Sequence, residues 1–254
     1  MTSSTDTGNA IAATIDAYIS SFDAGRGDNP VSTAQKITST FLEAAKTGEE
    51  LPEPWAIYQS IVSRIRTTTH DSLTQDNLVK LVGAIKETRP EPKEDYWSSL
   101  YPLGLYMREL WNGDYPATEW ASLNAFVARL TVANVLDFQL FGIWAMRSAL
   151  ENGPAEGELS NDVLNQQIPA AAVWIFYAGS KLWDLSTKEA NAGETAARGG
   201  QKWQGTWGYN QPRWVFWKMR FEGFAGRKDL RQDTTTMAKK ALEGMSKVDE
   251  TVTN

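Results

Sequence analysis

The sequence predicts an all-α fold, a single globular array of about nine or ten helices. Apolar residues recur at helical spacing through most of the chain, and no alternation with a period of two lasts long enough to indicate a strand. One segment, residues 168–185 (IPAAAVWIFYAGSKLWDL), is apolar on nearly all sides, which is typical of a helix at the centre of a protein. We expect one domain over residues 1–254, with an N-terminal helical layer at 1–88, a core region at 95–226 and a C-terminal helix at 229–247.

Four helices are expected in the N-terminal layer. The first spans residues 9–23, where apolar side chains fall on one stripe, and Ser32 can cap the second. The third starts at LPEPW, with Pro54 tolerated in the first turn, and its apolar stripe begins at Trp55. The fourth runs through NLVKLVGAIKET (77–88) and ends before a proline.

The core region opens with a charged segment that contains prolines, RPEPKED (89–95), which is predicted to be a surface loop. The next segment, YWSSLYPLGLYMRELWNG (96–113), is expected to be helical despite Pro102 and to stop at Asn112 and Gly113. Thr118 opens a long helix that is expected to bend near residues 133–135 before it continues to Leu150.

The longest irregular stretch, residues 186–211, follows the central helix. A loop of this length within a domain is usually functional or disordered. Pro212 then opens a helix that reaches about Phe224. The last helix is expected to start near Asp229 or Asp233, and the final residues, KVDETVTN, are expected to fray.

Four tryptophans lie in the stretch GGQKWQGTWGYNQPRWVFWKMRF (199–221). Trp214 and Trp217 fall on one face of the predicted helix, so we assign them to the core. Trp203 and Trp207 lie in glycine-rich loop sequence instead, where the backbone can approach another group closely. They either pack back onto the core or line a ligand site, and both interpretations stay open.

The segments AAAVWIFYAGSKLW, GGQKWQG and PRWVFWKMRF, in this order, resemble the C-terminal signature of a large fungal family of helical proteins known only as a domain of unknown function. The resemblance covers about residues 95 to 225 and implies a fungal source and an all-helical fold, but no activity. The family pattern reads approximately GG-x-x-W-x-G and then RW-x-x-W-x-x-RF. The matching positions are Gly199, Gly200, Trp203, Gly205, Arg213, Trp214, Trp217, Arg220 and Phe221.

Charge is unevenly distributed along a chain whose net charge is −6. Residues 198–240 hold ten basic and three acidic side chains, and the rest of the chain is acidic. Arg213 and Arg220 lie two turns apart on one helix and, with Lys202 and Arg198, could hold a carboxylate or phosphate. The alternative is that they pair with acidic residues of the chain itself. Duplex nucleic acid is not an expected partner, because most of the surface would repel phosphate.

Several carboxylates fall within or beside strongly apolar helices: Glu109, Asp137, Glu151, Asp184 and Glu222. We expect Asp137 to be the buried acid of this set, because its neighbours in TVANVLDFQLFGIWAM are apolar. It would either pair with an arginine such as Arg129, Arg147 or Arg213, or act as an acid in an aromatic pocket.

Catalytic and metal motifs are absent from the sequence. The chain has no cysteine and one histidine, His70, so a thiolate or histidine metal site is not expected, and no cofactor is predicted. The N-terminal segment lacks the features of a signal peptide, and no segment is apolar enough to span a membrane. The sequence therefore predicts a cytoplasmic protein.

Two functional hypotheses remain from the sequence. The favoured one is a non-enzymatic helical interaction or scaffold protein whose tryptophans are all core and whose acidic face meets a protein partner. The alternative is a small-molecule binding protein, or a cofactor-independent enzyme, for an apolar metabolite that could also be anionic. In that case Trp203, Trp207, Arg213 and Arg220 would line the pocket. A closed apolar pocket beneath residues 199–211 would favour the alternative.

Overall fold

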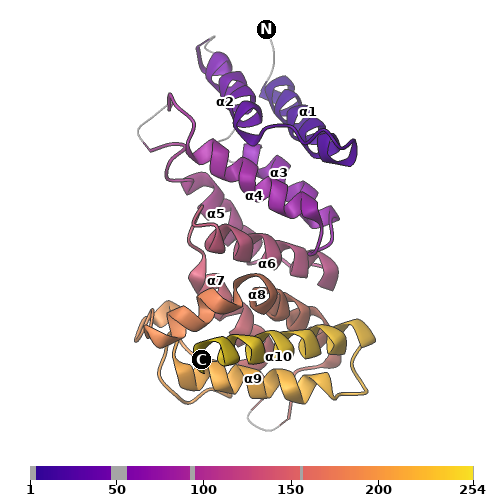
Figure 1. Cartoon of the computed structure of the whole chain (residues 1–254), viewed down its shortest axis with the longest axis vertical. Helices are drawn as coiled ribbons and strands as arrows, with labels where there is room; N and C mark the ends of the chain where they lie inside the picture. The colour runs from indigo at the N-terminus through magenta and orange to yellow at the C-terminus, as the bar shows by residue number, and fades with distance from the viewer. Residues whose placement is uncertain (1–3, 47–55, 92–94, 155–156, 254) are drawn as a thin grey trace. The chain divides into compact units, whose positions relative to one another are not determined.

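The computed structural model describes residues 4–46, 56–91, 95–154 and 157–253, and throughout these ranges the regular structure is helical (Figure 1). The predicted all-α fold is confirmed. The chain divides into two compact units, Met1–Asp114 and Tyr115–Asn254. Whether these units form one domain stays a prediction.

The first unit contains five helices: α1 (Ser4–Asp23), α2 (Pro30–Lys46), α3 (Ala56–Thr67), α4 (Leu73–Lys86) and α5 (Tyr101–Leu110). α1 packs against α2 and α3, while α4 packs against α2. The apolar stripes predicted for the first and third helices are buried at Ile11 and Ile15 on α1 and at Ile61 and Ile65 on α3.

Helix starts differ from the predictions in the first unit. Asn29 caps α2, since its Oδ1 accepts the Val31 N–H at 2.8 Å, and the predicted cap Ser32 lies inside the helix. The helix expected from residue 96 begins only at Tyr101, because Leu100 adopts a left-handed conformation and Pro102 favours the first turn. Pro54 and Trp55 lie outside the described residues.

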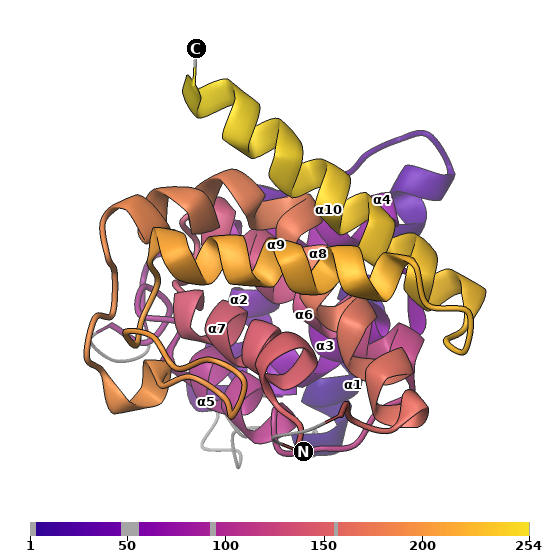
Figure 2. The ribbon, with the colours of Figure 1, turned by 90° about the horizontal axis from the view of Figure 1, so that it is seen from below.

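The second unit is built around α8 (Asn161–Thr187), the predicted apolar central helix. α8 packs against α6 (Ala117–Val132), and it also packs against α10 (Gln232–Thr253). α7 (Gln139–Met146) runs directly into a π-helical turn, Arg147–Glu151, and both contact α8. α9 (Gln211–Ala225) packs against α10 and α8. In Figure 2 α9 faces the viewer, with the loop that precedes it beside it.

The predicted bend after the helix that starts near Thr118 is present. α6 ends at Val132, and Asn134 adopts a left-handed conformation before α7 begins. The long irregular stretch is also present, because only a short 3-10 turn, Thr195–Ala197, interrupts residues 188–210.

The prediction that the C-terminal tail frays is wrong, because α10 continues to Thr253. Asp249 ties this end of the helix to α9. One carboxylate oxygen accepts the Trp214 indole N–H at 2.9 Å, and the other accepts the Lys218 ammonium at 2.6 Å. Among the helices that the structure describes, none combines the length and apolar character needed to cross a membrane.

Candidate functional site

Residues 197–210, here called the glycine–tryptophan loop, lead directly into α9, and Asn210 sets the start of that helix. The Asn210 side chain accepts the Arg213 backbone N–H at 2.8 Å, and a proline lies in the first turn. This start turns Trp214, Trp217 and Phe221 into the core, as the sequence predicts.

Arg213 forms an ion pair with Glu151, the last residue of the π-helical turn. Arg213 Nε lies 2.7 Å from Glu151 Oε1, and Nη2 lies 2.9 Å from Oε2. Both side chains are completely buried. A buried ion pair is stable only when its remaining donors and acceptors are also satisfied.

The other side-chain hydrogen bonds of Glu151 and Arg213 go to α9 and to the loop that precedes it, both in the second unit. The Glu151 carboxylate also accepts the Trp217 indole N–H at 2.6 Å and the Gly200 backbone N–H at 2.9 Å. Arg213 donates to three carbonyl oxygens of the loop, those of Ala197, Arg198 and Gly208. All five N–H groups of the guanidinium are therefore used. The pair holds both ends of the loop against α9.

The three glycines of the GG-x-x-W-x-G segment lie where a side chain would not fit. A Cβ on Gly199 would lie 2.5 Å from the Trp203 ring, and one on Gly205 would lie 2.4 Å from it. A Cβ on Gly200 would lie 2.7 Å from the Glu151 backbone. The GG-x-x-W-x-G spacing is therefore a packing requirement, since the indole of Trp203 lies between two glycines.

Trp203 makes contacts within the chain. Its ring packs on Phe216 of α9 with centroids 5.4 Å apart, and its indole N–H donates to the Thr206 carbonyl at 3.0 Å. It remains partly exposed. Of the two interpretations of this residue, the geometry favours packing onto the chain, and ligand contact stays a prediction.

Arg220 is also paired. Its guanidinium makes two hydrogen bonds to the Glu158 carboxylate, at 2.7 and 2.6 Å, and Nε donates to the Leu150 carbonyl at 2.9 Å. Burial acts to raise the pKa of Glu158, but the hydrogen bonds and charge of Arg220 outweigh it, so this pKa lies below its usual range. Arg213 and Arg220 thus pair with acidic residues of the chain, the second of the two alternatives drawn from the sequence.

Asp137 is not the buried acid, and this prediction is wrong. The residue is exposed in the turn before α7, where its Oδ1 accepts the Gln139 N–H at 2.9 Å. A carboxylate at this position satisfies a free N–H group at the start of the helix, and here it does so in contact with solvent. The buried acid is Glu151, and its partner is Arg213.

Trp207 is the one candidate whose ring lies largely at the surface, with 42% of the residue exposed. It lines an open surface groove of about 280 Å³, together with Trp203, Tyr209 and Pro212. The space beneath the loop is filled by the Glu151–Arg213 pair and by the fully buried rings of Tyr209 and Trp217.

A family model described as "Protein of unknown function (DUF3632)" matches residues 55–221. The chain belongs to this family. The match to DUF3632 includes α3 to α8 and ends within α9, at Phe221. A comparison with curated proteins and one with solved structures each gave no significant match.

The chemistry that this site of the DUF3632 chain can perform follows from its geometry. The buried charges of Glu151 and Arg213 are saturated by hydrogen bonds within the chain, and these bonds position the backbone of the loop. His70 lies in the turn between α3 and α4, in the first unit. Within the described ranges, no group of three or more His, Cys, Asp or Glu side chains is placed to hold a metal ion.

Proposed function

We propose that the chain is a non-enzymatic helical interaction protein. Its docking surface is the outer face of α9 with the adjoining loop, here called the loop–α9 surface and defined by Trp207, Pro212, Val215 and Met219. The observation that carries the proposal is the exposure of large apolar side chains on a backbone that the buried Glu151–Arg213 pair holds in place.

The composition of the loop–α9 surface is that of an interface centre. Val215 is 63% exposed and Met219 56% exposed, and they lie one turn apart on the same face of α9. All exposed residues from Gln204 to Met219 are uncharged, including Gln204, Thr206 and Gln211. Interface centres are depleted in charge and enriched in aromatic residues and methionine, and their rims are polar. The exposed Glu189 and Glu222 provide such a rim.

The partner that we assign to this surface is a second copy of the chain. With a net charge of −6, two copies repel each other over most of their surface. A surface whose centre carries no charge reduces this repulsion, and a twofold axis through α9 would bring Val215 and Met219 of both copies together. Twofold dimers are the commonest assemblies of soluble proteins.

Sedimentation velocity over a wide range of protein concentration tests this proposal. We expect the wild-type chain to form a dimer and the Val215→Glu/Met219→Glu variant to be monomeric, because facing copies would then bury like charges. The control is Val163→Glu, which places one such charge at an exposed apolar position in the first turn of α8. This control should remain dimeric. A wild-type chain that is monomeric at every concentration, or a double variant that still dimerises, would contradict the proposal.

A second candidate function, binding of a small apolar molecule, is favoured by the groove beside Trp207. Its volume of about 280 Å³ lies just below the range of about 300–1,000 Å³ that is usual for ligand pockets, so only a small molecule would fit. Glu189 lines the same groove and would repel an anionic ligand, so a neutral apolar metabolite fits better. Native mass spectrometry tests this candidate. A bound mass that is lost on denaturation and in Trp207→Ala would support it, and an apo mass would oppose it.

The signature in residues 199–221 supports a fungal source, and the cysteine-free composition is compatible with a cytoplasmic location. Fluorescence microscopy of the tagged chain in a fungal host tests the location. A diffuse cytoplasmic signal is expected, and a signal confined to another compartment would contradict it.

A further inference from the structure

Two arginine side chains of the second unit converge on one carbonyl oxygen. The Arg147 Nη1 atom donates to the Arg198 carbonyl at 3.1 Å, and the Arg213 Nη2 atom donates to the same oxygen at 3.2 Å. The two guanidinium groups are therefore neighbours, and Arg198, whose backbone both of them contact, brings a third positive charge that also acts on Arg147.

The negative charge nearby does not balance these three. The Glu151 carboxylate already accepts four hydrogen bonds, none of them from Arg147. Among the described residues, no carboxylate lies within salt-bridge distance, 4.0 Å, of Arg147 or Arg198. Arg147 is also partly buried, so water solvates its charge incompletely.

The electrostatics of Arg147 agree with this geometry. Burial, and then the charges of Arg198 and Arg213, lower the pKa of Arg147 below its usual value. An arginine nevertheless remains protonated at neutral pH, so the excess positive charge persists. The arrangement therefore costs free energy.

The segment that carries Arg198 is held in position from both sides. The Trp144 indole N–H of α7 donates to the Ala196 carbonyl at 2.8 Å, and Arg213 Nη1 donates to the Ala197 carbonyl at 2.9 Å. A site held in this way loses little conformational entropy when a ligand binds.

We propose that Arg147 and Arg198 form a binding site for an oxyanion, the phosphate or carboxylate group of a small ligand. Arginine suits such a group, because its planar guanidinium can donate two parallel hydrogen bonds to two oxygen atoms. Arg213 takes no direct part, because its five N–H groups are all used within the chain. The site shares no lining residue with the groove beside Trp207 and does not depend on the proposed dimer.

Thermal unfolding of the full chain in phosphate-free buffer tests this proposal, with inorganic phosphate, acetate and chloride added at equal ionic strength. Phosphate, acetate or both should raise the wild-type Tm by about 2–4 °C more than chloride does, once the anion concentration is several-fold above its Kd. A rise with phosphate alone assigns the site to phosphate groups, and a rise with acetate extends it to carboxylates.

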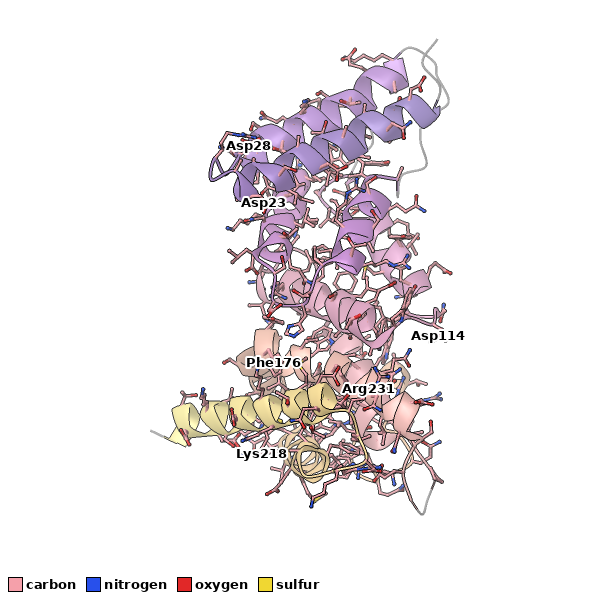
Figure 3. All side chains as sticks on the ribbon, turned by 90° about the vertical axis from the view of Figure 1, so that its right-hand side faces the viewer. Asp23, Asp28, Asp114, Phe176, Lys218 and Arg231 are labelled. Atoms are coloured by element: carbon pink, nitrogen blue, oxygen red, sulfur yellow. The ribbon has the colours of Figure 1, made fainter. Side chains whose placement is uncertain are left out.

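Variants separate the site from general salt effects. Arg147→Gln and Arg198→Gln should abolish the rise, and the matched control Arg231→Gln, at the exposed position labelled in Figure 3, should retain it. Without added anion, Arg147→Gln should be at least as stable as the wild type, because it removes a poorly solvated like charge. A rise no larger than that with chloride, or one that persists in both Arg147→Gln and Arg198→Gln, would overturn the proposal. Because Arg198 is exposed, its variant keeps the test valid even if Arg147→Gln does not fold.

Discussion

The Trp217 indole nitrogen lies 2.6 Å from Oε1 of Glu151, the same oxygen that accepts Nε of Arg213 at 2.7 Å. Trp217 and Arg213 lie one turn apart on α9, whereas Glu151 precedes them by more than sixty residues. One buried carboxylate thus joins α9 to the end of the π-helical turn, and through Gly200 to the loop.

The stability of the fold should depend on this carboxylate. Glu151→Gln and Arg213→Met should each lower the free energy of unfolding by about 3–5 kcal/mol, because each leaves a buried charge without its partner. The double variant should lose much less than the sum, since neither charge then remains. Urea unfolding followed by circular dichroism measures all three.

The control for that cycle is the exposed pair Lys188–Asp184, with an N–O distance of 2.8 Å. Lys188→Ala should cost less than about 1 kcal/mol. If Glu151→Gln lowers the free energy of unfolding by no more than Lys188→Ala does, the buried pair contributes little to stability.

The glycines around Trp203 should not tolerate a methyl group. Gly205→Ala should destabilise the chain by about 1–3 kcal/mol through overpacking against the indole, and it should shift tryptophan fluorescence. Gly223→Ala is the matched control, since a Cβ at this position of α9 meets nothing within 4 Å. It should stabilise the helix by roughly 0.5–1 kcal/mol. Equal effects of the two substitutions would contradict the packing of Trp203.

Tyr209 should contribute to alkaline unfolding. Complete burial raises the pKa of its hydroxyl far above the usual value of about 10, and the hydroxyl donates to the Gln139 carbonyl at 2.7 Å. Since the folded-state pKa is raised, the stability due to this group is fully present below pH 10 and is lost as the pH rises further. Burial also raises the pKa of Tyr58, so more than one tyrosine contributes to the loss of stability above pH 10.

Tyr209→Phe should cost about 0.5–1.5 kcal/mol at neutral pH, where the hydrogen bond is lost. Above pH 10 its stability should fall less steeply with pH than that of the wild type, as measured by urea unfolding at several pH values. Tyr101→Phe, at an exposed position, should leave the slope unchanged. If Tyr209→Phe also leaves it unchanged, the hydroxyl is not buried as described.

The contact of Asp249 with α9 should make the end of α10 part of the folded structure. Asp249→Ala should destabilise the chain by about 1–3 kcal/mol, because the partly buried Trp214 N–H and Lys218 ammonium lose their acceptor. Glu243→Ala alters an exposed carboxylate of the same helix and serves as the control in the same unfolding experiment. Equal, negligible effects would support a frayed tail instead.

Helices and their buried faces could be predicted from the sequence, because periodicity is a local signal. The stripe of Trp214, Trp217 and Phe221 is an example, since its burial follows from spacing alone. The contacts of the candidate site are harder to predict from the sequence, because its hydrogen bonds join residues that lie far apart in the chain. Asp137 and Glu151 both lie beside apolar sequence, and only the fold shows that the first occupies an exposed turn.

The role of Arg213 illustrates the same limit. Its charge and position suggested an anion site, and nothing in the local sequence shows that Glu151 and three loop carbonyls already use its donors. A better indication was the double glycine at 199–200, which implies close backbone approach. The groups approached are the Trp203 ring and the Glu151 backbone.

Hydrogen exchange measured by mass spectrometry tests the central claim most directly, namely that the Glu151–Arg213 pair holds the loop as a fixed surface. In the wild type, peptides covering residues 199–209 should be protected, since the N–H groups of Gly200, Lys202 and Tyr209 all donate within the fold. In Glu151→Gln this protection should fall strongly, while that of α6 is retained. Rapid exchange of these peptides in the wild type, or unchanged protection in Glu151→Gln, would contradict the account.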